Sequence, residues 1–184
     1  MVVYYVAMRK VIYGAAVTLD GYIGRIDGSV DYLVMTPDVE KLMAEFFATL
    51  DTVVMGRKSW AQSAKMHEGE EPPVGPWKGY VFSRTLPPGE REGTTFVNQS
   101  PREFVDELRK SPGKNIFLMG GGELARSFLQ DDAIDEVHVG LLPILLGEGI
   151  PFFPPGFPQR NFRLMEQGNY DKSSVWLKYE RVRD

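Results

Sequence analysis

Short, continuously apolar runs alternate along this chain with stretches in which apolar residues recur at helical spacing. The apolar runs predict buried β-strands at residues 9–17, 52–55, 115–119 and 136–142. Between the first two runs, apolar side chains recur from Val39 to Leu50, and Thr36 followed by Pro37 is typical of a helix start. We therefore expect a helix there, with one face in the core.

Weaker signals complete the pattern. Residues 79–83 and 94–98 predict short strands, and Ser100, Pro101 and Glu103 predict a further helix start. Residues 162–166 and 174–181 alternate as an antiparallel pair would, joined around residues 168–169. Glycine and aspartate indicate a mobile loop after the first strand, and proline, glycine and glutamate indicate a surface loop over residues 64–78.

Together these elements predict the fold class. Strands that alternate with helices and end in a hairpin are typical of an α/β protein with a mixed, mainly parallel sheet and helices on both faces. A length of 184 residues fits one domain spanning residues 1–184, because single cores usually divide only beyond about 250 residues.

Composition narrows the possible partners and location. With 21 basic and 25 acidic residues, the net charge is only -4, which argues against nucleic acid as a partner. There is no cysteine, as is ordinary for a protein in the reducing cytoplasm, where we expect it to reside. The apolar first ten residues are too short to span a bilayer, so no membrane association is expected.

The junction after residues 115–119 is the most informative in the chain. Gly120, Gly121 and Gly122 follow the strand directly and open a predicted helix. Glycines at a helix start let backbone N–H groups approach a phosphate, where the helix dipole also favours an anion. The alternative is a tight turn in which glycine only permits close packing.

Two basic turns follow other strands. Gly56, Arg57, Lys58 and Ser59 come after residues 52–55, and Ser83 with Arg84 lies at the end of the strand predicted at residues 79–83. In a parallel sheet both turns would gather at the same carboxyl edge, near the glycine turn. Guanidinium and hydroxyl groups there suit a phosphate monoester such as the 2'-phosphate of NADPH, although each alone could be an ordinary solvated residue.

Carboxylates are abundant between the first strand and the first long helix, and any of them could accept the N–H groups of a heterocycle. Most of them are expected to be loop caps. They are Asp20, Asp27, Asp31, Asp38 and Glu40. His67 and His138 have no second ligand at suitable spacing, so we expect no metal site.

Taken in order, five segments of the chain resemble dihydrofolate reductases. They are AAVTLDGYIG, VVMGRKSW, VFSRTL, FLMGGGELARSFL and the closing aromatic hairpin. GSVDYL at residues 28–33 and IDEVHVGLLPILLGEGIPFF at residues 134–153 are more similar to the riboflavin-pathway reductase domain, and we place the chain with that family.

The resemblance implies an NADPH-dependent oxidoreductase and assigns cofactor contacts. Ala16 and Ile23 would contact the nicotinamide carboxamide through their main chain, and Gly24 is a further cofactor-binding residue. The turn from Gly56 to Ser59 would hold phosphate. Ser83 and Arg84 would bind the 2'-phosphate and adenosine side. The diphosphate turn would comprise Gly120, Gly121, Gly122, Glu123 and Leu124.

The substrate side follows the family less closely. Dihydrofolate reductases carry a proline–tryptophan pair before the substrate-binding acid, where this chain has Asp31 and Tyr32. An ungapped count places Glu40 at the acid position, and a gap of two residues would replace it by Asp38. Asp20, Asp31 and Glu40 are our candidate catalytic residues, acting on a small molecule such as a ribosylaminopyrimidine.

Three outcomes remain open at this point: a riboflavin-type reductase, a dihydrofolate reductase, or a non-catalytic nucleotide-binding protein on the same fold. We also expect a homodimer, because the first seven residues, the LLPILL run and the PFFPPGF segment are unusually apolar for the surface of a small monomer.

Overall fold

The computed structural model describes residues 8–66, 77–91, 93–170 and 172–183. Its strands are β1 (Val11–Thr18), β2 (Tyr22–Gly24), β3 (Leu50–Gly56), β4 (Lys78–Phe82), β5 (Gly89–Arg91), β6 (Thr94–Val97), β7 (Asn115–Gly120), β8 (Glu136–Leu142), β9 (Ile150–Pro151), β10 (Asn161–Asn169) and β11 (Val175–Val182). Its helices are α1 (Pro37–Ala48), α2 (Arg57–Met66), α3 (Pro101–Arg109) and α4 (Gly122–Gln130).

One nine-stranded sheet forms the centre of the molecule, in the order β10-β11-β8-β1-β7-β3-β4-β6-β5. The six strands from β8 to β6 run parallel to one another. The antiparallel β10–β11 pair extends the sheet at one edge, and β5 runs antiparallel to β6 at the other. The prediction of a mixed, mainly parallel sheet with a C-terminal hairpin is confirmed.

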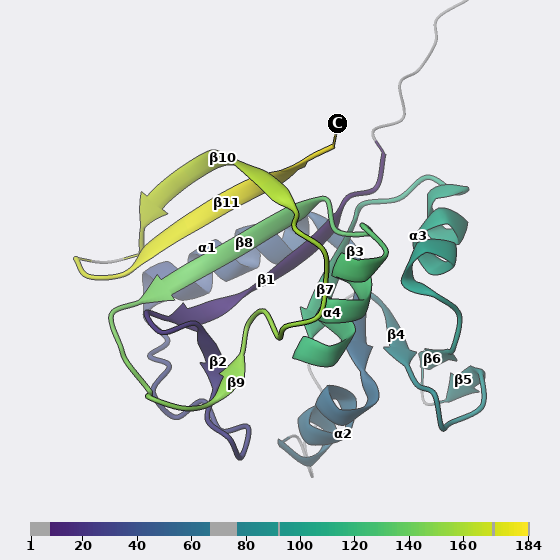
Figure 1. Cartoon of the computed structure of the whole chain (residues 1–184), viewed down its shortest axis with the longest axis horizontal. Helices are drawn as coiled ribbons and strands as arrows, with labels where there is room; N and C mark the ends of the chain where they lie inside the picture. Colours follow the sequence, from purple (N-terminus) through teal and green to yellow (C-terminus); the bar gives the residue numbers. More distant parts are fainter. Residues whose placement is uncertain (1–7, 67–76, 92, 171, 184) are drawn as a thin grey trace, which may run out of the picture.

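Helices cover both faces of the sheet, as predicted. In Figure 1, α1 lies behind the sheet and α4 lies in front of it. Phe128 of α4 and Phe104 of α3 are fully or almost fully buried, and both rings contact Phe82 of β4 edge to face. On the other side, Phe46 of α1 packs edge to face on Phe117 of β7, with ring centroids 5.1 Å apart.

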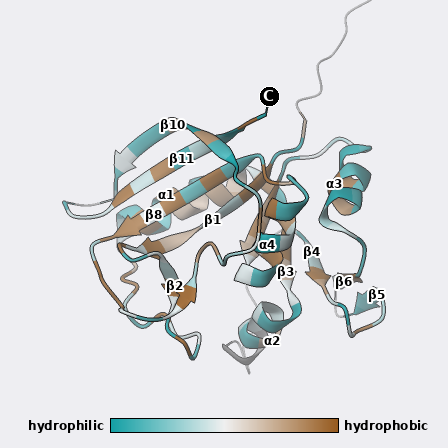
Figure 2. Ribbon diagram, viewed as in Figure 1, coloured by the Kyte–Doolittle hydropathy of each residue, from teal (hydrophilic) through white to brown (hydrophobic). Residues whose placement is uncertain are grey.

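The hydropathy of the elements follows this layering. The central strands β1, β3 and β8 are largely brown in Figure 2, whereas β10 and α3 show much teal. Val11 and Val54 of these strands are completely buried, and Val137 almost so. Continuous apolar runs in the sequence therefore mark the strands that are covered on both faces.

Helix starts form as the sequence predicts. The side chain of Thr36 accepts a hydrogen bond from the N–H group of Val39, with Pro37 in the first turn of α1. Ser100 and Glu103 form a reciprocal capping box at α3. Each cap satisfies N–H groups that the helix itself leaves without partners.

Several sequence predictions need correction. The segment after β1 was predicted to be a loop, but its middle forms β2, which pairs antiparallel with β9. α1 contains no buried residue, so its inner face is only partly covered. Residues 168–169 belong to β10, and the hairpin turns after them, where the N–H group of Tyr170 donates to the carbonyl of Ser174.

Three further predictions concern the ends of the chain and the long loop. α2 extends to Met66, into the segment predicted as a loop, while residues 67–76, which include His67, lie outside the described part of the chain. The apolar first seven residues lie outside it as well. None of the described helices is long and apolar enough to cross a membrane.

Candidate functional site

Three sharp turns leave neighbouring parallel strands at one edge of the sheet. β3 lies between β7 and β4, and its last residues pair with the ends of both, Met55 with Gly120 and Gly56 with Phe82. The basic turn after β3, the Ser83 turn after β4 and the glycine turn after β7 therefore lie side by side. This is the convergence at one carboxyl edge that the sequence predicted.

The glycine turn has a backbone that only glycine adopts readily. Gly120 has a φ of +118°, and a Cβ built on it would meet no atom within 4 Å. Gly121 is the N-cap of α4 and brings no side chain to cap it. In the described part of the chain, the N–H groups of Gly122 and Glu123 have no hydrogen-bond partner. Space is open at Gly120, whereas Gly122 packs closely against Pro151 and Pro154. The N–H groups of Gly122 and Glu123 lie at the positive end of a helix, which favours an anion.

A hydrogen bond ties this turn to the next one. The N–H group of Gly121 donates to Oγ of Ser59, 3.1 Å away, and a Cβ on Gly121 would lie only 3.0 Å from that oxygen. Ser59 stands in the first turn of α2. The serine therefore fixes the spacing between the glycine turn and the basic turn.

Cations at this edge are exposed and unpaired. Arg57, Lys58 and Arg84 are all exposed. Within the described residues, none of their side chains has a hydrogen-bond or ion-pair partner. By contrast, Ser83 is 5% exposed, and its Oγ accepts hydrogen bonds from the N–H groups of Thr85 and Leu86. Ser83 therefore shapes the turn that presents Arg84 and is itself buried in that turn.

Two other residues of the glycine turn point elsewhere. The carboxylate of Glu123 pairs with Arg126 one helical turn along the surface of α4. The side chain of Leu124 is 9% exposed and belongs to the core, while its N–H group donates to the carbonyl of Gly121. Any contact of Glu123 with a ligand at this turn therefore involves its main chain.

The sheet is open between β1 and β7 next to these turns. β1 pairs with β7 only from Val11 to Tyr13, although β1 continues to Thr18. Ala16 lies in this unpaired stretch and is partly buried. Its other neighbour is Gly140 of β8. On this side, β1 has no strand partner beyond Tyr13 among the described residues.

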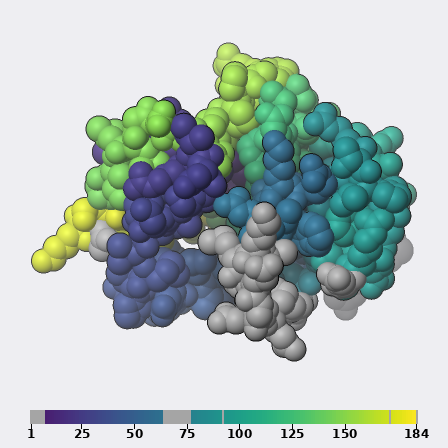
Figure 3. All heavy atoms as spheres, turned by 90° about the horizontal axis from the view of Figure 1, so that it is seen from below, coloured from purple at the N-terminus to yellow at the C-terminus, as the bar shows by residue number. Residues whose placement is uncertain are grey.

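The β2 segment closes one side of this opening. Ile23 packs against the main core, and Gly24 pairs with Ile150 of β9. The loop that follows reaches α2, where Nε2 of Gln62 donates to the carbonyl of Gly28 over 3.0 Å. Seen from below in Figure 3, the purple segment after β1 and the blue segment of α2 lie side by side. The loop after β2 and α2 are therefore in direct contact.

Asp20, a candidate catalytic residue, is held by three donors. The Thr18 hydroxyl donates to Oδ1 over 2.6 Å, and the N–H groups of Leu146 and Gly147 donate to Oδ2 over 3.0 and 2.7 Å. These bonds, that from Thr18 foremost, lower the pKa of Asp20. A carboxylate stabilised in this way is a poor proton donor at neutral pH. Its hydrogen bonds join the turn after β1 to the loop around Leu146, and we call this arrangement the Asp20 clamp.

Asp31 and Glu40 lie on the surface. Nε of Arg25 donates to Oδ1 of Asp31 over 2.6 Å, which lowers the pKa of this carboxyl, and the side chain is 65% exposed. Glu40 is exposed in the first turn of α1. The alternative acid, Asp38, instead lines a hollow between α1 and the β10–β11 hairpin. The structure does not bring the three candidate carboxylates together.

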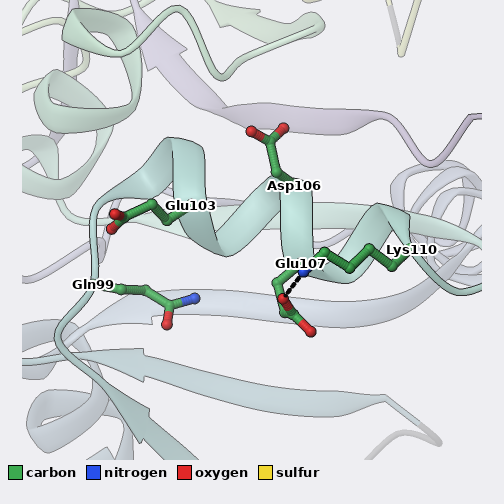
Figure 4. A pocket seen from close by; sticks show the side chains of 5 residues that line it. All are labelled: Gln99, Glu103, Asp106, Glu107 and Lys110. Carbon is green, nitrogen blue, oxygen red and sulfur yellow. Dashed lines mark hydrogen bonds and ion pairs between the residues drawn. The ribbon is translucent and has the colours of Figure 1, made fainter.

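A second, shallow hollow follows α3. Gln99, Glu103, Asp106, Glu107 and Lys110 line it, as Figure 4 shows. These side chains point outward, and Lys110 pairs with Glu107 along the helix. The hollow contains no residue of the three turns and has the character of an ordinary solvated helix surface.

Sequence reasoning missed the residues that hold the site together. The Thr18 hydroxyl donates to Asp20 and accepts from the N–H group of Tyr22. Gln62 donates to the carbonyl of Gly28, 34 residues away along the chain. Threonine two residues before aspartate is a usable signal of a side-chain-capped turn. Nothing in the sequence around Gln62 indicates its contact.

Comparison with known proteins places the chain in a family. The model of the RibD C-terminal domain matches residues 9–175. The chain belongs to the RibD C-terminal domain family. Among relatives, it is 36% identical to the uncharacterized protein YwjB of Bacillus subtilis over 178 residues, covering 95% of this chain and 99% of that protein. It is 33% identical to YyaP of the same organism over 180 residues, covering 93% and 94%.

Solved structures share the architecture of this RibD-type domain. A Shewanella protein named for riboflavin biosynthesis superimposes with a TM-score of 0.82 at 25% identity, covering 95% of this chain and 99% of that one. RibD of Acinetobacter baumannii gives 0.70 at 16% identity, covering 95% and 58%. Dihydrofolate reductase of Enterococcus faecalis, complexed with NADP(H), gives 0.69 at 18% identity, covering 95% and 97%. The predicted resemblance and the dihydrofolate reductase-like fold are confirmed.

Proposed function

We propose that this protein is an NADPH-dependent reductase of the riboflavin-biosynthesis type. It would transfer a hydride from NADPH to a small heterocyclic substrate such as a ribosylaminopyrimidine. Membership of the RibD C-terminal domain family supports a reductase-like role.

One observation carries the proposal. The glycine turn presents the N–H groups of Gly122 and Glu123 at the start of α4, and exposed arginines flank it after β3 and β4. Neither these N–H groups nor the arginine side chains have a partner among the described residues. A diphosphate needs the first feature, and a phosphate monoester on the adenosine side accounts for the second. No other edge of the described structure combines the two.

Different parts of the site would bind different groups of the cofactor. The N–H groups of the glycine turn would hold the diphosphate, Arg57 and Arg84 the 2'-phosphate, and the free edge of β1 at Ala16 the nicotinamide. When bound, NADPH supplies the hydride. The protein supplies orientation, which by itself can account for much of the rate enhancement of such a transfer.

The candidate carboxylates take different parts in this proposal. Asp20 positions the β1–β2 turn against the loop around Leu146 and so fixes Ile23 beside the nicotinamide site. Asp31 holds Arg25 at the rim. Glu40 is exposed at the start of α1, where it could reach a substrate that extends past the helix.

The fold is also compatible with two other functions. A dihydrofolate reductase would share the sheet and the glycine turn, and a non-catalytic nucleotide-binding protein would share the cofactor contacts. The first would oxidise NADPH with dihydrofolate and be blocked by antifolates. The second would bind NADPH without turnover on any substrate.

Turnover distinguishes the three. NADPH oxidation at 340 nm should be followed with a panel of pyrimidines, ribosylaminopyrimidines and pterins. Oxidation with a ribosylaminopyrimidine, insensitive to antifolates, is the result we expect. Tight NADPH binding without turnover on the whole panel would favour the non-catalytic protein, and absence of NADPH binding would remove the proposal.

A further inference from the structure

The start of α4 packs against the segment that follows β9. A Cβ built on Gly122 would lie 3.2 Å from the carbonyl oxygen of Pro151 and 3.2 Å from Cγ of Pro154. Figure 1 shows the chain passing beside α4 after it leaves β9. We call residues 151–154 the proline segment. Because this segment lies so close to Gly122, its position limits where the N–H group of Gly122 can lie.

A buried tyrosine of the central sheet holds the proline segment. Tyr13 of β1 is 1% exposed, and its hydroxyl donates to the carbonyl of Phe152 over 2.6 Å. The two rings are stacked, with centroids 4.4 Å apart and planes inclined by only 11°. Phe152 is itself buried, and its carbonyl has no other donor among the described residues. Burial raises the pKa of Tyr13, so the hydroxyl keeps its proton and remains a donor at neutral pH.

These contacts hold the glycine turn from both ends. Tyr13 is the last residue of β1 that pairs with β7, and its partner Leu118 lies two residues before Gly120. β7 leads into the glycine turn, Gly122 contacts the proline segment, and the proline segment is bonded to Tyr13. A turn that is held at both ends has fewer conformations to lose when it binds a ligand, which favours tighter binding.

We propose that Tyr13 is a positioning residue for the diphosphate: through the proline segment it fixes the N–H groups of Gly122 and Glu123 at the start of α4. Tyr13 acts through these groups and not on the ligand, because only 1% of it is exposed. The inference rests on the proposed function for the identification of the anion with the diphosphate of NADPH. Removing the Tyr13 hydroxyl should therefore weaken the binding of ligands that carry a diphosphate and spare ligands that bind only through Arg57 and Arg84.

Tyr13→Phe removes the hydroxyl and keeps the stacked ring, so the buried carbonyl of Phe152 loses its donor. By calorimetry we expect NADPH to bind about fivefold more weakly, and 2'-AMP, which has the 2'-phosphate but no diphosphate, to change less than about twofold. Tyr80→Phe is the control. Tyr80 of β4 packs edge to face on Phe104, and its hydroxyl has no hydrogen bond among the described residues, so neither ligand should be affected. Equal weakening of NADPH and 2'-AMP in Tyr13→Phe, or unchanged binding of NADPH, would overturn the inference.

A double-mutant cycle tests whether Tyr13 acts through the contact at Gly122. Gly122→Ala places a methyl group against the proline segment from the other side and should also weaken NADPH. In the Tyr13→Phe background the segment can yield to this methyl group, so the two substitutions together should weaken NADPH by less than the product of their single effects. A combined effect equal to that product would show that Tyr13 acts by another route. Urea denaturation of each variant confirms that it is folded.

Amide hydrogen exchange tests the positioning without a ligand. The N–H groups of Phe152 and Gly121 are both hydrogen-bonded, and both should exchange at least about threefold faster in Tyr13→Phe. Val54 in β3 should exchange at the rate of the unmodified protein, because a local loosening does not reach the centre of the sheet. Unchanged exchange at Phe152 and Gly121, or equal acceleration at all three residues, would mean that Tyr13 only supports the fold.

NADPH binding of the unmodified protein distinguishes a failure of this inference from a failure of the proposed function. NADPH that binds equally well to the unmodified protein and to Tyr13→Phe rejects the role of Tyr13 alone. Absence of NADPH binding, together with faster exchange at Gly121 in the variant, rejects the reductase and supports the role of Tyr13 in holding the turn.

Discussion

Arg84 is an exposed arginine presented by a turn whose shape is set by the buried Ser83 hydroxyl. Its guanidinium has no partner among the described residues. A cation in this state is free to bind a ligand phosphate at little internal cost. NADH lacks the phosphate that we assign to Arg84, so the residue separates the two cofactors.

Arg84→Ala should therefore weaken NADPH about tenfold or more and leave NADH nearly unchanged. Isothermal calorimetry with both cofactors measures the two effects. Arg163→Ala, which removes an exposed arginine on β10 that pairs with Glu180, is the control and should affect neither. Equal weakening of NADPH and NADH would mean that Arg84 contacts the diphosphate or supports the fold.

Gly120 is the second residue at which a single substitution tests the proposed site. Its φ of +118° is strained for any residue with a Cβ, so Gly120→Ala should lower the free energy of unfolding by about 1–3 kcal/mol and also weaken NADPH. Gly79→Ala in β4 is the control, because a Cβ there meets Thr94 only at ordinary contact distance. Chemical denaturation that finds the two variants equally stable would contradict this account.

Among the elements, those with a local signal were predictable from sequence. Buried apolar runs identified β1, β3, β7 and β8, and cap residues identified the starts of α1 and α3, because these depend on neighbours along the chain. β2 and β5 were missed. β2 is a three-residue strand that exists only because β9, some 125 residues away, pairs with it.

The site was predictable to the same extent. The glycine and basic turns are local motifs, and their convergence follows from parallel strands. The opening between β1 and β7, the Asp20 clamp and the contact of Tyr13 with Phe152 depend on long-range register, which no local pattern contains. For the substrate side, the sequence alone gave only two alternatives for the substrate-binding acid, Asp38 and Glu40.

The buried carboxylate of Glu136 at the start of β8 should make the stability of the protein depend on pH in the acid range. The Glu136 side chain is 6% exposed and contacts Nε2 of His138 at 2.8 Å and Nζ of Lys10 at 2.7 Å. Burial alone would raise the pKa of Glu136, but these hydrogen bonds and the lysine charges outweigh it and hold the pKa at about 2. The ionised carboxylate is therefore more stable in the folded state than in the unfolded chain.

Because the folded pKa is lowered, the stabilisation is present in full above the ordinary pKa near 4.5 and is lost as the pH falls toward 2. Glu136→Gln should lower the free energy of unfolding by about 1–3 kcal/mol at pH 7 and reduce its dependence on pH in that acid range. Urea denaturation from pH 7 down to pH 2.5 tests this. An unchanged acid dependence in the variant would show that Glu136 does not carry it.

For the whole molecule, exposed apolar side chains predict self-association. Leu145 is 70% exposed, Met165 48%, Leu164 44% and Phe153 42%. Exposed apolar surface of this kind often marks a contact between subunits, so we expect a homodimer. Light scattering at micromolar concentration should return twice the 20.8 kDa of the chain, and a monomer mass would contradict the prediction.

The central claim is that the carboxyl edge of β3, β4 and β7 is built for NADPH. Calorimetric titration of the unmodified protein with NADPH and with NADH tests it most directly. We expect NADPH to bind at least about tenfold more tightly, because its additional phosphate would meet Arg57 and Arg84, which have no partner among the described residues. Equal affinity for the two cofactors, or no binding of either, would contradict the account.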